Sequence, residues 1–177
     1  MIIRQETERD FPQIRAFVKT AFQTAHRADG TEQDYVDKLR SGNTYLPALA
    51  LVMEDENADN KLIGHIMLTK IAIKGAASMP KNMFEILLLA PVAIDETYRN
   101  KGLGSDLIRD SLARAKDEGY AAVILVGDPH YYGRLGFVSA DRFRIQNKQN
   151  IPNENVLIYE LTPGILDGME GTVDFFG

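Results

Sequence analysis

The chain has 177 residues, of which 45% are hydrophobic and 25% are charged, a composition typical of globular proteins rather than of fibrous or disordered ones. Lys and Arg number 20 against 25 Asp and Glu, and the resulting net charge of −5 argues against broad affinity for nucleic acid or for an anionic membrane surface. We therefore expect one globular domain over residues 1–177.

Cysteine is absent from the sequence, which excludes structural disulfides, cysteine-based zinc sites and a cysteine nucleophile. The three histidines, His26, His65 and His130, are widely spaced, so we expect no metal site. The amino terminus has no apolar signal segment, and the longest apolar run, residues 86–94, is too short to cross a bilayer. We therefore expect a cytoplasmic protein without membrane association.

The elements of the first half follow from the spacing of apolar residues. Such residues recur every three or four positions through residues 11–22, which predicts a helix with one buried face. Two aliphatic and β-branched runs flank the polar residues 54–61 and predict two strands joined by a hairpin loop. In chain order we expect a strand at 2–5, helices at 11–22 and 32–40, and strands at 48–53 and 62–73.

The second half contains the most hydrophobic strand, residues 85–94, which follows a loop at 74–82 and is expected to be buried on both faces. Pro91 lies inside this strand and has no N–H for a ladder, so we expect a bulge or a splayed edge there. The later elements are predicted as a helix at 102–119, a strand at 121–126, a short helix at 129–135, and strands that begin at 137 and 156. This order predicts an α/β (α+β) fold with one β-loop-α-β unit.

Residues 99–105, which we call the 99–105 segment, lie between the buried strand and the strongest helix. A helix start exposes unpaired backbone N–H groups and the positive end of the helix dipole, and both favour phosphate. The segment does not match a dinucleotide fingerprint, because Leu107 stands where a small residue is needed, and the chain has no P-loop. A tight turn without a ligand remains the alternative.

Two motifs give the chain a family resemblance. Arg99-x-x-Gly102-x-Gly104, after a strand that ends at Ile94, resembles the acetyl-coenzyme A motif of the GNAT N-acetyltransferase superfamily. Tyr132-x-x-x-Gly136-Phe137 resembles the family's second signature, and the likeness is sharpest from residue 87 to 137. The carboxy-terminal residues 163–173 are similar to those of one bacterial branch of predicted acetyltransferases.

The resemblance implies a GNAT-like single domain with a central twisted mixed sheet of about six or seven strands, flanked by helices. It also implies a cleft between the fourth and fifth strands. The acetyl-CoA-binding core would span about residues 85–138, and residues 163–177 would form a carboxy-terminal extension.

The resemblance further implies that acetyl-CoA is the co-substrate and that the strand end and the 99–105 segment hold it. The pantetheine arm would pair with the backbone of Val92, Ala93 and Ile94. The pyrophosphate would lie on the amides of the following segment, with charge from its basic side chains. The residues concerned are Arg99, Asn100, Lys101, Gly102, Leu103, Gly104 and Ser105.

Tyr132 occupies the family's general-acid position, with packing against the pocket wall as the alternative role and Tyr131 as the alternative acid. Glu85 is the candidate base, although an exposed strand-end carboxylate is the competing interpretation. Asp128 and His130 are expected at the mouth of the cleft, with His130 as a possible proton shuttle or a solvated loop residue. His65 is expected to be a hydrogen-bonded structural residue.

The implied function is acyl transfer from acetyl-CoA to a primary amine of a small molecule, peptide or protein. Without cysteine there is no acetyl-cysteine intermediate, so direct attack in a ternary complex is favoured. The acceptor would lie near residues 22–42, where His26, Arg27, Asp29 and Glu32 are candidates or simply solvated residues. A non-catalytic acyl-CoA-binding sensor or interaction module is the alternative. Dimers are common in the family, which makes a homodimer an open alternative to a monomer.

Overall fold

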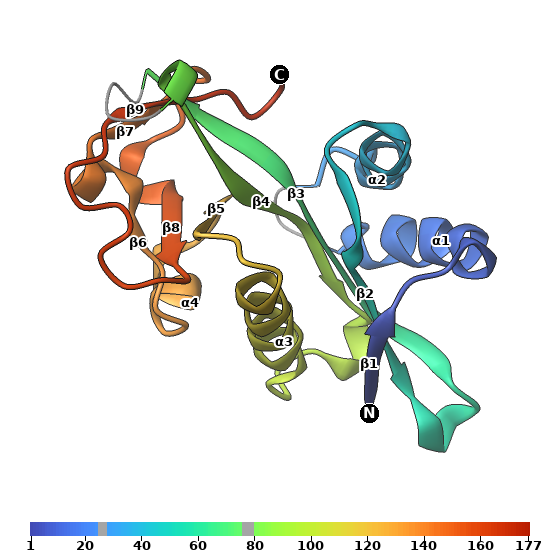
Figure 1. Cartoon of the computed structure of the whole chain (residues 1–177). Coiled ribbons are helices and arrows are strands. Elements are labelled where there is room, and N and C mark those ends of the chain that lie inside the picture. The colour runs from blue at the N-terminus through green and yellow to red at the C-terminus, as the bar shows by residue number, and fades with distance from the viewer. Residues whose placement is uncertain (25–27, 76–79) are drawn as a thin grey trace. The chain divides into compact units, whose positions relative to one another are not determined.

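The computed structural model describes residues 1–24, 28–75 and 80–177 (Figure 1). These residues form two compact units, which we call the amino-terminal unit (Met1–Thr69 and Ala90–Arg114) and the carboxy-terminal unit (Lys70–Leu89 and Ala115–Gly177). The long strands β3 (Lys61–Lys74) and β4 (Met83–Ile94) each contribute residues to both units, as does helix α3 (Leu103–Asp117).

The amino-terminal unit is built on an antiparallel meander. Strand β1 (Ile2–Gln5) pairs with β2 (Tyr45–Asp55), and β2 pairs with β3. Helices α1 (Phe11–Phe22) and α2 (Glu32–Ser41) lie on one side of β2 and β3, and α3 lies on the other side (Figure 1). Residues therefore alternate along β2 between a face toward α1 and a face toward α3.

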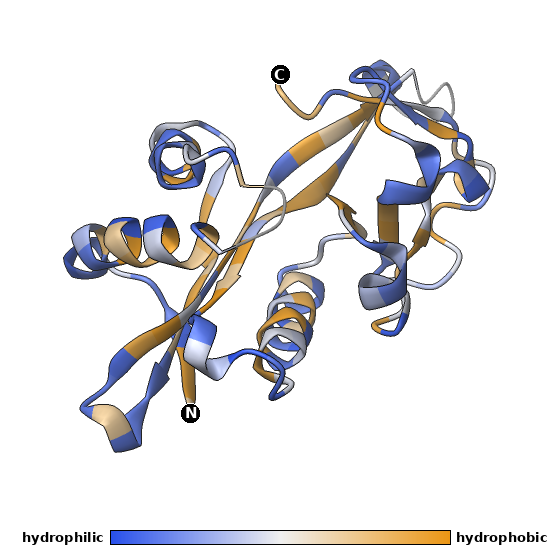
Figure 2. Ribbon diagram, turned by 180° about the vertical axis from the view of Figure 1, so that it is seen from behind, coloured by the Kyte–Doolittle hydropathy of each residue, from blue (hydrophilic) through white to orange (hydrophobic). Residues whose placement is uncertain are grey.

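The face toward α1 and α2 forms an apolar cluster. Ile14 and Val18 of α1 and Val36 of α2 are fully buried against Ala50 and Val52 of β2. Ahead of α1, the N–H and hydroxyl of Thr7 both donate to the Asp10 carboxylate at 2.7 and 2.9 Å, in a capping box. The predicted apolar face of the first helix is confirmed. Figure 2 shows the strands largely hydrophobic and α2 mostly hydrophilic.

The opposite face packs against α3, and the absence of a side chain at Gly64 allows a close approach there. A Cβ on Gly64 would lie 3.0 Å from Ile94 Cδ1 and 3.1 Å from Met53 Cβ, and Leu107 Cδ2 is 3.3 Å away. A side chain at this position would require its neighbours to move by a few tenths of an ångström. Gly64 therefore sets the packing of α3 and of the end of β4 on the meander.

The carboxy-terminal unit continues the sheet with β5 (Ala122–Val126), β6 (Val138–Ser139) and β8 (Val156–Glu160). β5 is parallel to β4 at Leu87↔Val123 and antiparallel to β8 at Ile124↔Ile158, and β6 pairs with β8. The parallel β4 and β5 with α3 between them confirm the predicted β-loop-α-β unit. Helix α4 (Pro129–Gly133) follows β5.

Two short strands of this unit were not predicted. β7 (Ile145–Asn147) runs parallel to β9 (Gly171–Val173), and β9 pairs with β3 at Lys74↔Thr172. Each has three residues and no alternating pattern, so neither gives a signal in the sequence. They add to the seven-strand path β1-β2-β3-β4-β5-β8-β6, which agrees with the expected mixed sheet.

Most predicted elements are present, and several of their bounds differ by a few residues. β2 continues through Asp55, so the hairpin connection is shorter than residues 54–61. β4 continues as a strand through Pro91, and its pairing with β5 ends at Leu88↔Ile124, ahead of the position where a bulge or splayed edge was predicted. Of the predicted loop at 74–82, residues 76–79 lie outside the described residues. The cleft and the domain bounds stay predictions.

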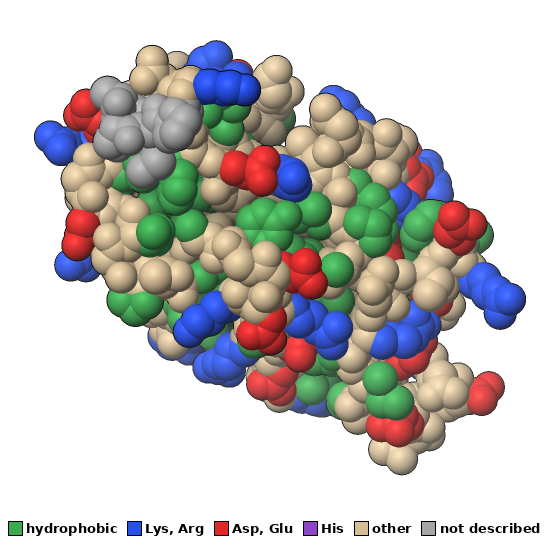
Figure 3. All heavy atoms as spheres, viewed as in Figure 1, with side chains coloured by type: hydrophobic (Ala, Val, Ile, Leu, Met, Phe, Trp, Pro, Cys, Tyr) green, Lys and Arg blue, Asp and Glu red, His purple; other side chains and the backbone are tan. Residues whose placement is uncertain are grey.

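Charged side chains of both signs are interspersed on the face shown in Figure 3. The ion pairs include Arg4 with Asp10 at 2.8 Å and Arg114 with Asp110 at 2.6 Å, all on partly exposed side chains. Such pairs contribute little to stability because water screens them. These partly exposed pairs therefore add little to the stability that the apolar clusters give.

Candidate functional site

The connection from β4 to α3 is fixed by hydrogen bonds to the β2–β3 hairpin. After β4 the chain makes one turn of 3₁₀ helix, η4 (Glu96–Tyr98). The N–H of Asp95 donates to the Ile63 carbonyl at 2.9 Å, and the Tyr98 hydroxyl donates to Asp55 at 2.8 Å. Asp55 is itself buried. The backbone that enters the 99–105 segment therefore starts from a fixed position in the amino-terminal unit.

The 99–105 segment turns through two residues in the left-handed region. Asn100 has φ 59° and Gly102 has φ 82°, and α3 begins at the next residue. The N–H of Asp106 donates to the Gly102 carbonyl at 3.0 Å, which closes the first helical turn. The first N–H groups of an α-helix receive no acceptor from the helix itself. The start of α3 is also the positive end of its helix dipole, where an anion is favoured.

The space around this turn suits a phosphate-bearing ligand. A Cβ built on Gly102 would meet no atom within 4 Å among the described residues. Asn100, Lys101 and Gly102 are exposed, and residues 103–105 are half-buried. A ligand can therefore reach the backbone here without displacing a side chain, so the residues fit the group that the sequence motif implies.

Arg99 uses its side chain on the protein. Its Nε donates to the Ile94 carbonyl at 3.1 Å, and one terminal nitrogen donates to the Thr24 hydroxyl at 2.8 Å. The other terminal nitrogen donates to the Ala21 carbonyl near the end of α1. The sequence suggested no such partners. A role of the guanidinium as a phosphate ligand stays a prediction.

Lys101 is also engaged with its own segment. Its Nζ donates to the Thr97 carbonyl at 2.9 Å and lies 5.1 Å from the centre of the Tyr98 ring. Lys61 approaches the same ring at 5.3 Å. Two cations therefore share one aromatic ring beside the 99–105 segment. As with Arg99, phosphate binding by Lys101 stays a prediction.

Beside the end of β4 the amino-terminal unit has a hollow of about 180 Å³, which we call the strand-end hollow. It brings together the end of α1 and the three strand residues to which the resemblance assigns the pantetheine arm. Ala93 is buried, whereas Val92 and Ile94 are partly exposed. The lining residues are Ala21, Phe22, Val92, Ala93, Ile94 and Arg99.

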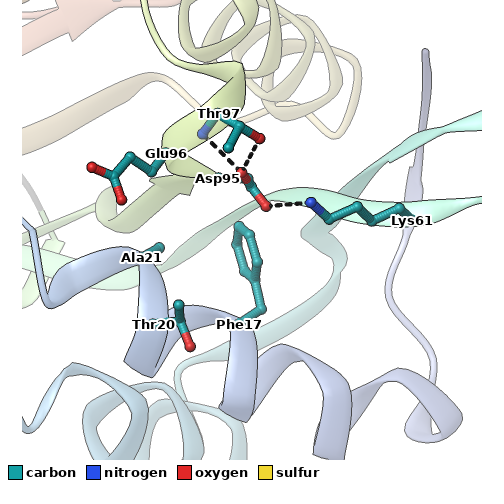
Figure 4. A pocket seen from close by; sticks show the side chains of 7 residues that line it. All are labelled: Phe17, Thr20, Ala21, Lys61, Asp95, Glu96 and Thr97. Atoms are coloured by element: carbon teal, nitrogen blue, oxygen red, sulfur yellow. Dashed lines mark hydrogen bonds and ion pairs between the residues drawn. The ribbon is translucent and has the colours of Figure 1, made fainter. Parts of the chain in front are cut away.

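A second hollow of about 220 Å³, the Phe17 hollow, lies in the same unit (Figure 4). In this hollow the Asp95 carboxylate accepts hydrogen bonds from the backbone N–H and the hydroxyl of Thr97. It also forms an ion pair with Lys61 at 2.8 Å. The sequence gives no signal for this hollow, because its residues come from three separate segments. They are Phe17, Thr20, Ala21, Lys61, Asp95, Glu96 and Thr97.

The second motif belongs to the carboxy-terminal unit, where one glycine before it and one within it have steric functions. A Cβ on Gly127 would lie 2.4 Å from Cε2 of Tyr132, so only glycine allows the ring its position. Gly136 has φ 96°, which a residue with a side chain rarely adopts. The N–H of Phe137 then donates to the Tyr132 carbonyl at 3.2 Å. The motif thus encodes a turn that packs around one tyrosine.

Tyr132 is held by aromatic rings. It makes edge contacts with Tyr131 and Phe137 at centroid distances of 4.9 and 5.7 Å. Burial raises the pKa of Tyr132 to about 12, with smaller contributions from Tyr131 and Asp128. With this pKa the hydroxyl keeps its proton at pH 7 and can donate a hydrogen bond. The aromatic packing is observed, and the acid role stays a prediction.

The other candidate residues have separate positions. Glu85 is exposed and forms an ion pair with Lys70 at 3.3 Å, so its role as a base stays a prediction. His130 is exposed, and its backbone N–H donates to the Asp128 carboxylate at 2.9 Å. Asp128 thereby caps the start of α4. His65 is fully buried, and its Nε2 lies 2.9 Å from a Glu6 carboxylate oxygen. The structural role predicted for His65 is confirmed.

The acceptor-side candidates are only partly described. His26 and Arg27 lie outside the described residues. The Glu32 carboxylate accepts hydrogen bonds from the N–H groups of Asp29 and Gly30 at 2.9 and 3.1 Å. Hydrogen bonds from Thr31 lower the pKa of Asp29. Asp29 and Glu32 therefore organise the turn before α2.

Within residues 1–24, 28–75 and 80–177, no three His, Asp or Glu side chains are grouped to hold a metal ion. In the same ranges, no helix combines the length and apolar character needed to cross a membrane.

Residues 2–140 match the family model described as "Acetyltransferase (GNAT) domain". Over 175 residues, the chain is 28% identical to YhbS of Escherichia coli K12, named an uncharacterized N-acetyltransferase; the match covers 99% of this chain and 96% of YhbS.

Solved structures agree with this family match. The crystal structure of E. coli YhbS in complex with CoA is similar with a TM-score of 0.84 and 27% identity, covering 98% of this chain and 88% of YhbS. A GNAT family acetyltransferase from Brucella melitensis in complex with acetyl-CoA has a TM-score of 0.75 and 26% identity, covering 97% and 93% of the two chains. With the family model extending over most of the sequence, and with both motifs folded as described, the chain belongs to the GNAT acetyltransferase family.

Proposed function

We propose that the protein transfers an acetyl group from acetyl-CoA to a primary amine of a small molecule, peptide or protein, by direct attack within a ternary complex. The observation that carries the proposal is the open left-handed turn at Gly102, which joins the end of β4 to the start of α3. The solved relatives described above contain CoA and acetyl-CoA, which supports the same ligand here.

In this proposal the backbone of the amino-terminal unit holds the coenzyme. The amides from Asn100 to Ser105 bind the pyrophosphate, and the α3 dipole favours its charge. The end of β4 from Val92 to Ile94, which lines the strand-end hollow, binds the pantetheine arm in the manner of an added strand. A strand N–H directed at a thioester carbonyl stabilises the oxyanion that develops when an amine attacks.

The proposal assigns Tyr132 to the departing sulfur, on the basis of the family motif and the local chemistry of the carboxy-terminal unit. Because the pKa of Tyr132 is raised to about 12, far above the pKa of about 8.5 for a free thiol, full proton transfer to the thiolate is uphill. The hydroxyl therefore acts mainly as a hydrogen-bond donor that stabilises charge on sulfur.

The attacking amine must lose a proton, since only its neutral form has a lone pair. An alkyl amine has a pKa near 10.4, so at pH 7 it is mostly protonated. Glu85 is our candidate to receive that proton, from its exposed position next to Lys70.

The test is an amine panel assayed by thiol release from acetyl-CoA. The protein has no cysteine, so a thiol reagent detects only the coenzyme product. Primary monoamines, diamines, amino acids and lysine peptides should be compared, with mass spectrometry of the acetylated product. We expect saturable release with at least one class. Binding of acetyl-CoA without release for any amine would favour the sensor alternative.

A further inference from the structure

The Arg99 side chain connects two parts of the amino-terminal unit that are far apart in the sequence. Among the described residues, its acceptors are the carbonyls of Ile94 and Ala21 and the hydroxyl of Thr24. Thr24 precedes Arg99 by 75 residues and Ala21 precedes it by 78. A guanidinium has five N–H donors in one plane, so a single side chain can bind all three oxygens.

The acceptors are chemically suited to this contact. The Ala21 carbonyl lies in the last turn of α1, where carbonyls receive no N–H donor from the helix itself. A cation there also complements the negative end of the helix dipole. Ile94 is the last residue of β4. Arg99 therefore joins the end of α1 to the end of β4.

The same two ends form the strand-end hollow. Ala21 and Phe22 line it from α1, and Val92 to Ile94 line it from β4. Ala21 also lines the Phe17 hollow. Any shift of α1 along β4 changes the shape of this wall. Beyond Phe22 the chain continues into residues 23–42, which the resemblance places on the acceptor side.

We propose that Arg99 is a positioning residue: it holds the end of α1 against the end of β4, and so sets the wall along which the acceptor amine approaches, without binding the pyrophosphate itself. The effect on the acceptor rests on the proposed acetyl transfer. The clamp between α1 and β4 does not, and it can be measured without any substrate.

The experiment compares Arg99→Gln with Thr24→Val, which removes one partner of the guanidinium and carries no charge that could bind phosphate. Arg99→Lys retains the charge but not the planar set of donors. Arg109→Gln is the matched control, because Arg109 is an exposed cation on α3 that pairs with Asp106 at 3.7 Å.

The first readout is hydrogen exchange of the ligand-free protein. In Arg99→Gln we expect the amides of residues 18–24 to exchange at least tenfold faster, in Thr24→Val about threefold faster, and in Arg109→Gln at the wild-type rate. Arg99→Lys should resemble Arg99→Gln. Wild-type exchange at residues 18–24 in Arg99→Gln would overturn the clamp.

The second readout separates positioning from phosphate binding. The two ligands are acetyl-CoA and acetyl-pantetheine, which has no phosphate. For each of them, the affinity of Arg99→Gln should lie within about twofold of the affinity of the wild type. A tenfold loss for acetyl-CoA alone would make Arg99 a phosphate ligand and contradict the proposal.

The third readout is kinetic. We expect Arg99→Gln to raise the KM for the amine about tenfold, with a smaller change in kcat and in the KM for acetyl-CoA. An unchanged KM for the amine would remove the acceptor role. If the wild type acetylates no amine, the proposed function fails, while hydrogen exchange and thioester binding still decide whether Arg99 is a clamp or a phosphate ligand.

Discussion

The 99–105 segment and the region around Tyr132 offer different atoms to a ligand. In the 99–105 segment the accessible groups are backbone amides, while Arg99 and Lys101 direct their side chains to protein carbonyls. In the other region the proposed group is the Tyr132 hydroxyl, on a ring that packs against Tyr131 and Phe137. A backbone site depends on φ and ψ, whereas a side-chain site depends on packing. The two regions should therefore respond to different substitutions.

The largest effect is expected from Gly102→Val. A β-branched residue is strained at φ 82° by about 1–3 kcal/mol, and its side chain would enter the open space over the amides. We expect acetyl-CoA affinity to fall at least 100-fold by calorimetry. Gly119→Val is the control, because Gly119 has φ 85° and equally open surroundings at the other end of α3. Equal affinity losses in both variants would indicate a general folding effect.

Tyr132→Phe should lower kcat about 100-fold and leave the Kd of acetyl-CoA within twofold. Because burial raises the pKa of Tyr132 to about 12, its hydroxyl keeps its proton throughout the pH range 7 to 9. The kcat/KM of both proteins should rise across that range as the amine is deprotonated. Tyr131→Phe is the comparison, and a larger loss in that variant would transfer the acid role to Tyr131.

Gly127→Ala tests whether packing alone controls the Tyr132 region. The new methyl group would overlap the ring at 2.4 Å, so the ring must move. We expect kcat to fall about tenfold and stability to fall by about 1–3 kcal/mol. Gly133→Ala introduces the same methyl group with no atom within 4 Å and serves as the control. Unchanged turnover in Gly127→Ala would show that the ring position is not important for catalysis.

The smallest effect is expected from Lys101→Gln. Because Nζ donates to the Thr97 carbonyl and lies over the Tyr98 ring, removing its charge should weaken acetyl-CoA binding less than about threefold. Calorimetry at low and high salt checks this. A salt-dependent loss of tenfold or more would mean that a side chain, and not the backbone, dominates phosphate binding.

The sequence allowed the local features of both regions to be predicted, because they are encoded by neighbouring residues. Gly102 and Gly136 are needed for positive φ, and their spacing to other motif residues is visible without a structure. The helix before Gly119 and the strand ending at Ile94 follow from apolar patterns. The family and the mixed sheet could therefore be predicted from short-range signals.

Contacts between distant residues could not be predicted in this way. Nothing near Arg99 in the sequence indicates that Ala21 and Thr24 are its partners. The ion pair of Glu85 with Lys70 and the three-residue strands β7 and β9 depend likewise on the folded arrangement of separate segments. As a result, residue types that suggested phosphate binding were found in contact with the protein.

Calorimetric titration of the wild-type protein with acetyl-CoA tests the central claim most directly, with NADH and ATP as controls. The account predicts saturable binding of acetyl-CoA at one site per chain, and weaker or no binding of the two other nucleotides, because they lack the pantetheine arm that would pair with Val92 to Ile94. Absence of acetyl-CoA binding would contradict both the assignment of the 99–105 segment and the proposed acetyl transfer.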